Sequence, residues 1–181
     1  MKTAAVIAAF LFLGCSQHLK FDLDKTLELE REDLIVMGVV SHLNEKSNYG
    51  KEMHKLNTSE KIVLIADNLQ SEVNNGGFDQ FYYNSSGNFA NETVEILSLV
   101  NATKTARIVN KANDQFPEGI VPQSRNIRIE VLQSIRAKST EVWDSLDSQF
   151  YRPNTMTGKM EVENLSKLLL DFIKSHRSDF R

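Results

Sequence analysis

The stretch from Glu72 to Gly87, EVNNGGFDQFYYNSSG, decides how this chain folds. It starts at the end of a helical pattern, passes through the pair Gly76-Gly77 and continues into an aromatic segment that begins at Phe78. Glycine adopts left-handed backbone conformations at little cost, so the pair predicts a sharp turn between two helices. After the pair, the segment up to Ser85 is long enough for about two helical turns.

The residues before this stretch predict a long amphipathic helix. Asn57 is a predicted N-cap, and Glu60 stands three residues later, where a capping box places its second partner. The apolar residues that follow step by three and four, which puts them on one face of a helix. They are Ile62, Ile65, Ala66, Leu69 and Val73. We expect this face to be buried.

The same helical period recurs along the rest of the chain, without a convincing run of strand-type alternation. Apolar residues predict helices over 34–43, 94–100, 106–116, 127–135 and 165–173, and a further one over 140–150 with Ser139 or Thr140 as its cap. Pro117 and Gly119 break the pattern, and residues 153–158 predict a loop. We therefore expect an all-α fold, a single globular bundle of about seven or eight helices after an N-terminal signal peptide.

The N-terminal segment has the features of an export signal. Lys2 gives a positive start, residues 4–14 are continuously apolar or small, and Cys15, the only cysteine, follows at once. About 11 apolar residues match a signal-peptide core and fall short of the roughly 20 that span a bilayer. Gly14 before the lone Cys15 resembles the lipobox of bacterial lipoproteins, which implies cleavage after Gly14 and lipid attachment to Cys15. An ordinary cleavable signal is the alternative.

These observations divide the chain into a signal peptide (1–14), a lipid-anchored lead-in (15–30) and an all-helical domain (31–181). The anchor predicts a place in the cell envelope, facing away from the cytoplasm. Ser16 after the cysteine implies the outer membrane in a cell that has one. The formal net charge of −3 is mildly acidic, which argues against a nucleic-acid partner.

The Glu72–Gly87 stretch also resembles the hallmark of a known family. Its order is similar to the pattern Glu-Val-x-Asn-Gly-Gly-Phe-x-Gln-Phe-x-x-Asn-Ser-Ser-Gly of a family of bacterial all-helical proteins named after a DNA-mimic protein. Residues 147–151 resemble a second element of that family, and residues 165–180 resemble its final helix. The resemblance covers about residue 57 to the C-terminus, and it implies the all-helical, DNA-mimic-family-like domain expected above.

The resemblance does not lead us to expect DNA mimicry in this chain. The family's namesake presents acidic residues spaced like DNA phosphates to a DNA-binding regulator. Here 24 acidic residues are interleaved with 21 basic ones. An exported protein would also meet no transcription factor.

The motif supplies the candidate site residues. They are Asn75, Gly76, Gly77, Phe78, Gln80, Asn84, Ser86 and Gly87. Turn chemistry explains most of them, since glycines permit the turn and amide or hydroxyl groups satisfy exposed backbone ends. The alternative is a polar pocket that recognises a small ligand or a peptide.

The sequence contains no recognisable catalytic or metal-binding pattern. The four histidines have no partner at a metal-ligand spacing, and neither a Gly-x-Ser-x-Gly elbow nor a phosphate-binding glycine loop is present. Carboxylate pairs such as Asp144 and Asp147 fit solvated helix faces. We expect no metal, no cofactor and no catalytic residue.

The sequence thus favours a membrane-anchored, non-catalytic module that binds an unidentified protein or peptide partner. The alternative is an envelope enzyme or small-ligand receptor that uses a polar pocket around the Asn-Gly-Gly-Phe motif.

Overall fold

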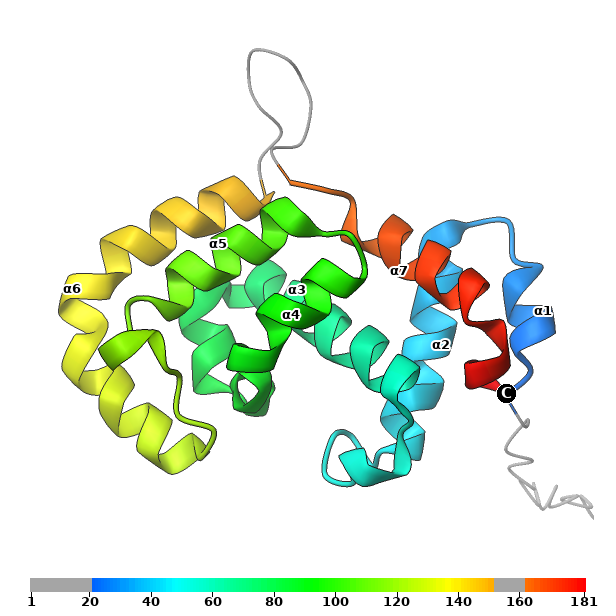
Figure 1. Cartoon of the computed structure of the whole chain (residues 1–181), viewed down its shortest axis with the longest axis horizontal. Helices are drawn as coiled ribbons and strands as arrows, with labels where there is room; N and C mark the ends of the chain where they lie inside the picture. The colour runs from blue at the N-terminus through cyan, green and yellow to red at the C-terminus, as the bar shows by residue number, and fades with distance from the viewer. Residues whose placement is uncertain (1–20, 152–161) are drawn as a thin grey trace, which may run out of the picture.

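Helix α3 (Thr58–Tyr83) lies at the centre of the fold and contacts α2, α4, α6 and α7 (Figure 1). The computed structural model describes residues 21–151 and 162–181. The predicted capping box is confirmed: the side chain of Asn57 accepts from the Glu60 N–H, and Glu60 accepts from the Asn57 N–H, both at 2.9 Å. The predicted apolar face is also confirmed, because Ile62, Leu69 and Val73 are buried with the rest of that stripe.

The described residues form seven α-helices and four short 3-10 helices, with no strand among them. Besides α3, these are α1 (Leu23–Leu27), α2 (Glu32–Lys46), η1 (Met53–Lys55), η2 (Ser85–Phe89), α4 (Ala90–Leu99), α5 (Thr103–Asn113), η3 (Pro117–Gly119), α6 (Arg125–Tyr151), α7 (Leu165–Ser175) and η4 (Arg177–Phe180). The all-α, single-bundle prediction is therefore confirmed. The predicted signal peptide, Cys15 and the predicted loop 153–158 lie outside the described residues.

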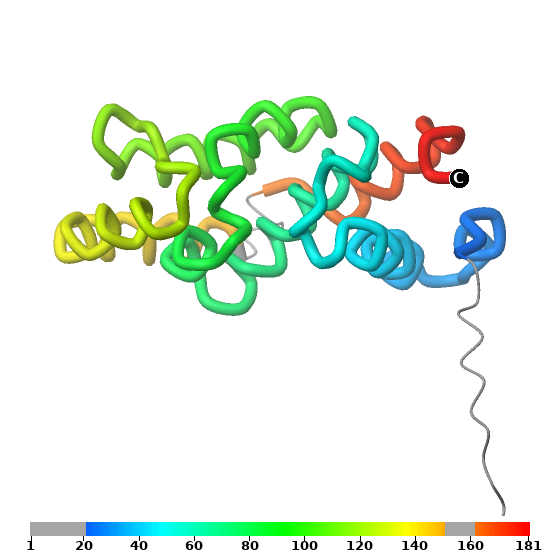
Figure 2. The backbone as a smooth tube through the Cα atoms, turned by 90° about the horizontal axis from the view of Figure 1, so that it is seen from below, coloured from blue at the N-terminus to red at the C-terminus, as the bar shows by residue number. Residues whose placement is uncertain are grey.

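The helices surround one continuous hydrophobic core. Helices α4 and α5 lie on one side of the layer formed by α6, α3 and α2 (Figure 2). Helix α6 closes one end of the molecule, and α1, α7 and η4 close the other (Figure 1). Leu23 of α1 is buried in this core, so the described part of the predicted lead-in packs against the bundle.

Helix α6 corrects the prediction of two helices separated by a cap at Ser139 or Thr140. It runs unbroken from Arg125 to Tyr151. One buried face continues through the predicted boundary, because its members recur every three or four residues. They are Arg128, Leu132, Ile135, Ser139, Trp143, Leu146 and Phe150. Burial of this face outweighs the local capping preference of Ser139, whose buried hydroxyl has no hydrogen-bond partner among the described residues.

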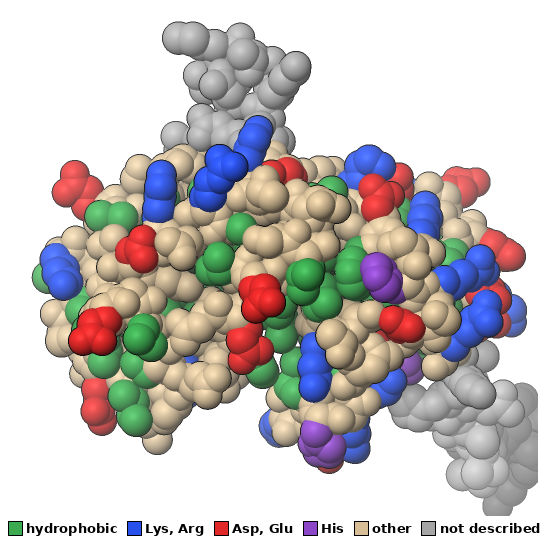
Figure 3. Space-filling model, viewed as in Figure 1, with side chains coloured by type: hydrophobic (Ala, Val, Ile, Leu, Met, Phe, Trp, Pro, Cys, Tyr) green, Lys and Arg blue, Asp and Glu red, His purple; other side chains and the backbone are tan. Residues whose placement is uncertain are grey.

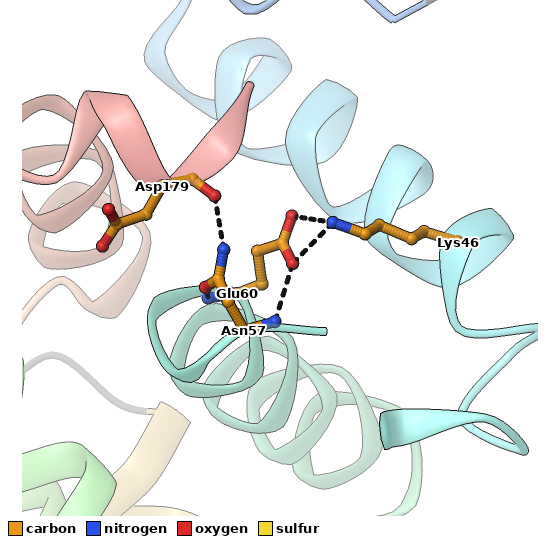
Figure 4. Close-up of polar contacts among 4 residues, drawn as sticks. All are labelled: Lys46, Asn57, Glu60 and Asp179. Atoms are coloured by element: carbon orange, nitrogen blue, oxygen red, sulfur yellow. Dashed lines mark hydrogen bonds and ion pairs between the residues drawn. The ribbon is translucent and has the colours of Figure 1, made fainter. Parts of the chain in front are cut away.

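A polar cluster joins the C-terminal turn to the start of α3 (Figure 4). Lys46 of α2 donates to both carboxylate oxygens of the buried Glu60, at 2.6 and 2.8 Å. Asn57 donates to the carbonyl oxygen of Asp179 at 2.6 Å. Phe180, next along the chain, is buried in the core. Helix α2 and η4 are thereby held against the same capping box that begins α3.

Candidate functional site

The carboxylate of Glu72 organises the polar side chains of the motif. Glu72 lies on α3 one turn before the glycine pair, and it accepts three hydrogen bonds at 2.8 Å. The donors are the amides of Gln80 and Asn84 and the hydroxyl of Ser86. Hydrogen bonds to a carboxylate are stronger than those between neutral groups. Glu72 therefore fastens the residues after the turn to the helix before it.

The glycine pair breaks α3 as predicted, although the two glycines play different parts. Gly77 has φ 74° and ψ −174°, a region that is essentially restricted to glycine, whereas Gly76 has φ −158°. The next N–H, that of Phe78, donates to Oδ1 of Asp147 on α6 at 2.9 Å. Asp147 therefore caps the second half of α3 from another helix, in the role that an N-cap side chain usually plays.

Arg128 is the second centre of the motif and is fully buried. Its guanidinium makes five hydrogen bonds, four of them to backbone carbonyl oxygens and one to a side-chain amide oxygen. The acceptors are the carbonyls of Tyr82, Asn84, Pro122 and Gln123 and Oδ1 of Asn88, at 2.7–2.9 Å. Burial, together with the charge of Arg125, lowers the pKa of Arg128 to about 10. The guanidinium thus joins the end of α3, η2 and the loop before α6.

Arg128 also explains why the motif ends in glycine. A Cβ atom at Gly87 would lie 2.8 Å from Nε of Arg128 and 2.9 Å from the carbonyl oxygen of Phe81. Both contacts are shorter than real Cβ atoms show, and the second is with backbone. Only glycine fits between the guanidinium and the end of α3.

The remaining candidate residues complete a structural unit. Phe78 is buried, and its ring packs against those of Tyr82 and Phe150. Asn75 is exposed and donates to Oε1 of Gln80 at 3.2 Å. Asn84 differs from the predicted backbone cap, since its amide binds Glu72 and its own carbonyl accepts from Arg128. Most of the polar groups of the motif are therefore engaged within the fold.

Sequence reasoning did not include Glu72, Arg128 or Asp147 among the candidate site residues, although Glu72 begins the motif stretch and Asp147 begins the second element of the family resemblance. Asp147 was assigned to a solvated face, but it is only partly exposed and bonds to the break in α3. A signal for Arg128 was present, because it stands four residues before Leu132 and seven before Ile135, in the register of the buried face. Ile127, which was assigned to that face instead, is 55% exposed.

Two carboxyl groups of the domain have strongly raised pKa values. Burial raises the pKa of Asp147 to about 6, the Phe78 N–H lowers it, and the charges of Asp144 and Asp79 add to the increase. Burial likewise raises the pKa of Asp67 to about 6, with the Ser71 hydroxyl acting in the opposite direction. Neither group belongs to a metal-binding cluster, because no group of three or more potential ligands occurs among the described residues.

A groove of about 290 Å³ separates the first two turns of α3 from α4, and we call it the α3–α4 groove. Its apolar lining consists of Met53, Ile62, Ile65, Phe89, Ile96 and Leu99. Leu99 is 54% exposed, so the lining reaches the surface. Lys61 stands on the α3 rim, and Glu92 and Glu95 stand on the α4 rim. Hydrophobic side chains gather in this region in Figure 3, with acidic side chains on the α4 side.

A second cavity, of about 340 Å³, lies beside the motif near Asn74. Its other polar groups already have partners. Glu163 accepts from the N–H groups of Lys104 and Thr105 at the start of α5, and Asn164 caps α7 by accepting from the Lys167 N–H. Gln70 bonds to Ser166. The cavity therefore lies where the ends of α5 and α7 meet, and these polar groups are not free to bind a ligand.

A protein-family model described as DMP19-like protein matches residues 54–176, more than half of the chain. The chain belongs to the DMP19-like protein family. Searches of curated proteins and of solved structures gave no match. The matched DMP19-like region runs from the turn before α3 to the end of α7, so it contains Glu72, Arg128, Asp147 and the α3–α4 groove.

This match corrects the family assignment made from the sequence motif. The assignment described a DNA-mimic-protein-like family running from about residue 57 to the C-terminus, with a lipoprotein-type signal in front. The family shown is that of DMP19-like proteins, and its match leaves out residues 1–53 and 177–181. Helices α1 and α2 and the turn η4 therefore flank the DMP19-like region. No helix in the described ranges is long and apolar enough to cross a membrane.

The two glycines of the break should differ in their tolerance of alanine. A Cβ atom at Gly77 would lie 2.2 Å from Oδ2 of Asp147 and would occupy a glycine-only backbone region. We expect Gly77→Ala to lower the free energy of unfolding by about 1–3 kcal/mol or more. At Gly76 the clash is with the Gln80 side chain, which can move, so Gly76→Ala should cost less. Urea melts of the two variants test this, and equal losses would contradict it.

Asp147 should make stability depend on pH. Its pKa is near 3.8 when unfolded and about 6 when folded, so the folded state favours the protonated form. Its contribution is therefore greatest below about pH 4, falls as the pH rises to about 6 and is constant above that. Asp147→Asn retains an acceptor for the Phe78 N–H and should be more stable than wild type at pH 7 by on the order of 1 kcal/mol, because solvent reaches the half-buried carboxyl and screens its charge.

Urea melts from pH 4 to 8 measure this effect, with Glu141→Gln, at an exposed position of the same helix, as the matched control. The advantage of Asp147→Asn should vanish near pH 4. A difference that does not change with pH would show that the carboxylate does not titrate as described.

Proposed function

We propose that this chain is a membrane-anchored, non-catalytic protein-binding module of the cell envelope, and that the α3–α4 groove is its binding surface. The observation that carries the proposal is the exposed apolar lining of the groove, which ends at the half-exposed Leu99. Apolar surface that opens to solvent inside a polar rim is typical of protein interaction sites. The rim here is formed by Lys61, Glu92 and Glu95.

The polar groups of the Asn-Gly-Gly-Phe motif already have hydrogen-bond partners within the fold, which favours the α3–α4 groove over the motif as the binding site. Glu72 is saturated by Gln80, Asn84 and Ser86, and Arg128 is saturated by neutral oxygens. A recognition pocket needs polar groups that are free to meet a ligand. The motif is better explained as the internal support that fixes α3, η2 and α6 relative to one another, which places α4 correctly beside α3.

The sequence supports the anchor. Residues 1–14 have the pattern of an export signal, and Cys15 stands where lipoprotein signals carry the modified cysteine. Two or more acyl chains anchor a protein firmly, because each buried methylene contributes about 0.8 kcal/mol. Nucleic acid is not proposed as a partner, since acidic and basic side chains are mixed over the face in Figure 3.

Replacement of the cysteine tests the anchor. Cys15→Ser should abolish incorporation of a fatty-acid analogue and either release the protein from the membrane fraction or leave its precursor unprocessed. Metabolic labelling of cells that produce the wild type and the variant measures this. Equal labelling of the two proteins would exclude Cys15 as the attachment site.

Photo-crosslinking in intact cells tests the binding function. A photoreactive amino acid at Leu99 should form an adduct with another protein. The same amino acid at Met37 or Ile127, which are 62% and 55% exposed outside the groove, should not. Adducts at the control positions alone would keep the binding function and reject the groove. No adduct at any of the three positions would contradict the proposed function.

A further inference from the structure

We infer that the α3–α4 groove binds a cationic amphipathic segment of a protein partner, with apolar residues spaced one helical turn apart and Lys or Arg beside them. The inference rests on the proposed function and adds the chemistry of the partner. It follows from three properties of the groove: its size, its apolar floor and the unpaired charges on its rim.

The groove suits side chains on one face of a short helix. Its walls are two turns of α3, from Thr58 to Ile65, and two turns of α4, from Glu92 to Leu99. Two helical turns extend over about 10 Å, the distance spanned by apolar anchors at positions i, i+4 and i+7, which follow one another at intervals of one turn. The volume of about 290 Å³ lies at the lower limit for pockets that enclose a whole small molecule. A few apolar side chains, carried on a backbone that stays outside, match this space.

The floor is apolar and already ordered. Ile62, Ile65 and Ile96 are at most 8% exposed, so the core holds them in place before anything binds. Leu99 stands above them on the outer wall and offers new apolar area to a partner. Burial of such area favours association because it removes apolar surface from water. A preordered floor also reduces the conformational entropy lost on binding.

The charges on the rim select the partner. Glu92 and Glu95 are exposed and make no ion pair or hydrogen bond through their carboxylates among the described residues. They stand three residues apart on α4, so they project to the same side and repel each other weakly. A Lys or Arg of the partner would relieve this repulsion and pair with both. Complementary charge of this kind gives specificity and speeds association.

Lys61 determines which side of the groove the basic residues of the partner segment occupy. It occupies the opposite rim, on α3, and also lacks an ion pair among the described residues. A basic residue there would be repelled, so the cations of the partner belong on the α4 side. The same two glutamates disfavour an anionic lipid surface as the occupant, because lipid phosphates would face them directly.

Two synthetic peptides with equal leucine spacing test the inference. One carries lysines beside the leucines and the other carries glutamates at the same positions. With the full chain in detergent, fluorescence anisotropy should show about tenfold tighter binding of the lysine peptide, the gain expected from two rim ion pairs. Added salt should reduce the difference. Glu92→Lys combined with Glu95→Lys should reverse the preference.

A matched control separates the rim from overall charge. Glu130→Lys with Glu141→Lys changes the net charge equally at exposed positions of α6 and should leave the preference unchanged. Loss of binding in Leu99→Glu should locate the lysine peptide in the groove.

Other results would overturn the inference. They are equal binding of the two peptides, no binding of either, or an equal effect of the control pair. If Leu99 still crosslinks to a protein in cells, the groove holds a partner of different chemistry and the proposed function stands. A dimer that light scattering detects in the wild type and not in Leu99→Glu would identify a second copy as the occupant, and would also overturn the inference.

Discussion

The left-handed break at Gly77 is the constraint on which the arrangement around the motif depends. Beyond the break, the rings of Phe78 and Tyr82 pack against Phe150 and Trp143 of α6. With the break, the second half of α3 turns, and Asp147 of α6 receives the first free N–H of the new helical segment. Glu72 then reaches forward across the turn to three side chains, and Arg128 closes the far end. The motif thus connects the two halves of α3, and hydrogen bonds that involve Glu72 before the break and Asp147 and Arg128 of α6 hold the two halves in place.

Local patterns predicted much of this fold because they are determined by neighbouring residues. The capping box at Asn57 and Glu60, the buried stripe of α3 and the turn at the glycine pair all depend on contacts within a few positions. The break in α6 was wrongly predicted for the same reason. Ser139 has the chemistry of a cap, and only the packing of Trp143 and Leu132 on one face shows that the helix continues.

The support of the candidate site could be predicted less well, because its partners are far apart in the chain. Asp147 is 69 positions from Phe78, and Arg128 is 44 positions from Asn84. The motif contains one residue of each pair, Phe78 or Asn84, but it does not indicate which distant residue will contact it. The α3–α4 groove also depends on residues that are far apart in the chain. The helical pattern assigned Ile62 to the buried face of its helix, and the groove that it lines with Ile96 forms only where α4 lies beside α3.

The two segments that flank the DMP19-like region fasten the ends of the described chain to each other. Asp24 of α1 pairs with Arg177 at 3.0 Å, and Phe180 is buried beside the cap of α3. The C-terminal turn is also joined to the start of α3, because Asn57 donates to the carbonyl oxygen of Asp179 and the Ser59 hydroxyl donates to its carboxylate. The two ends of the described chain therefore close on each other beside the start of the DMP19-like region, so local unfolding of one end should loosen the other.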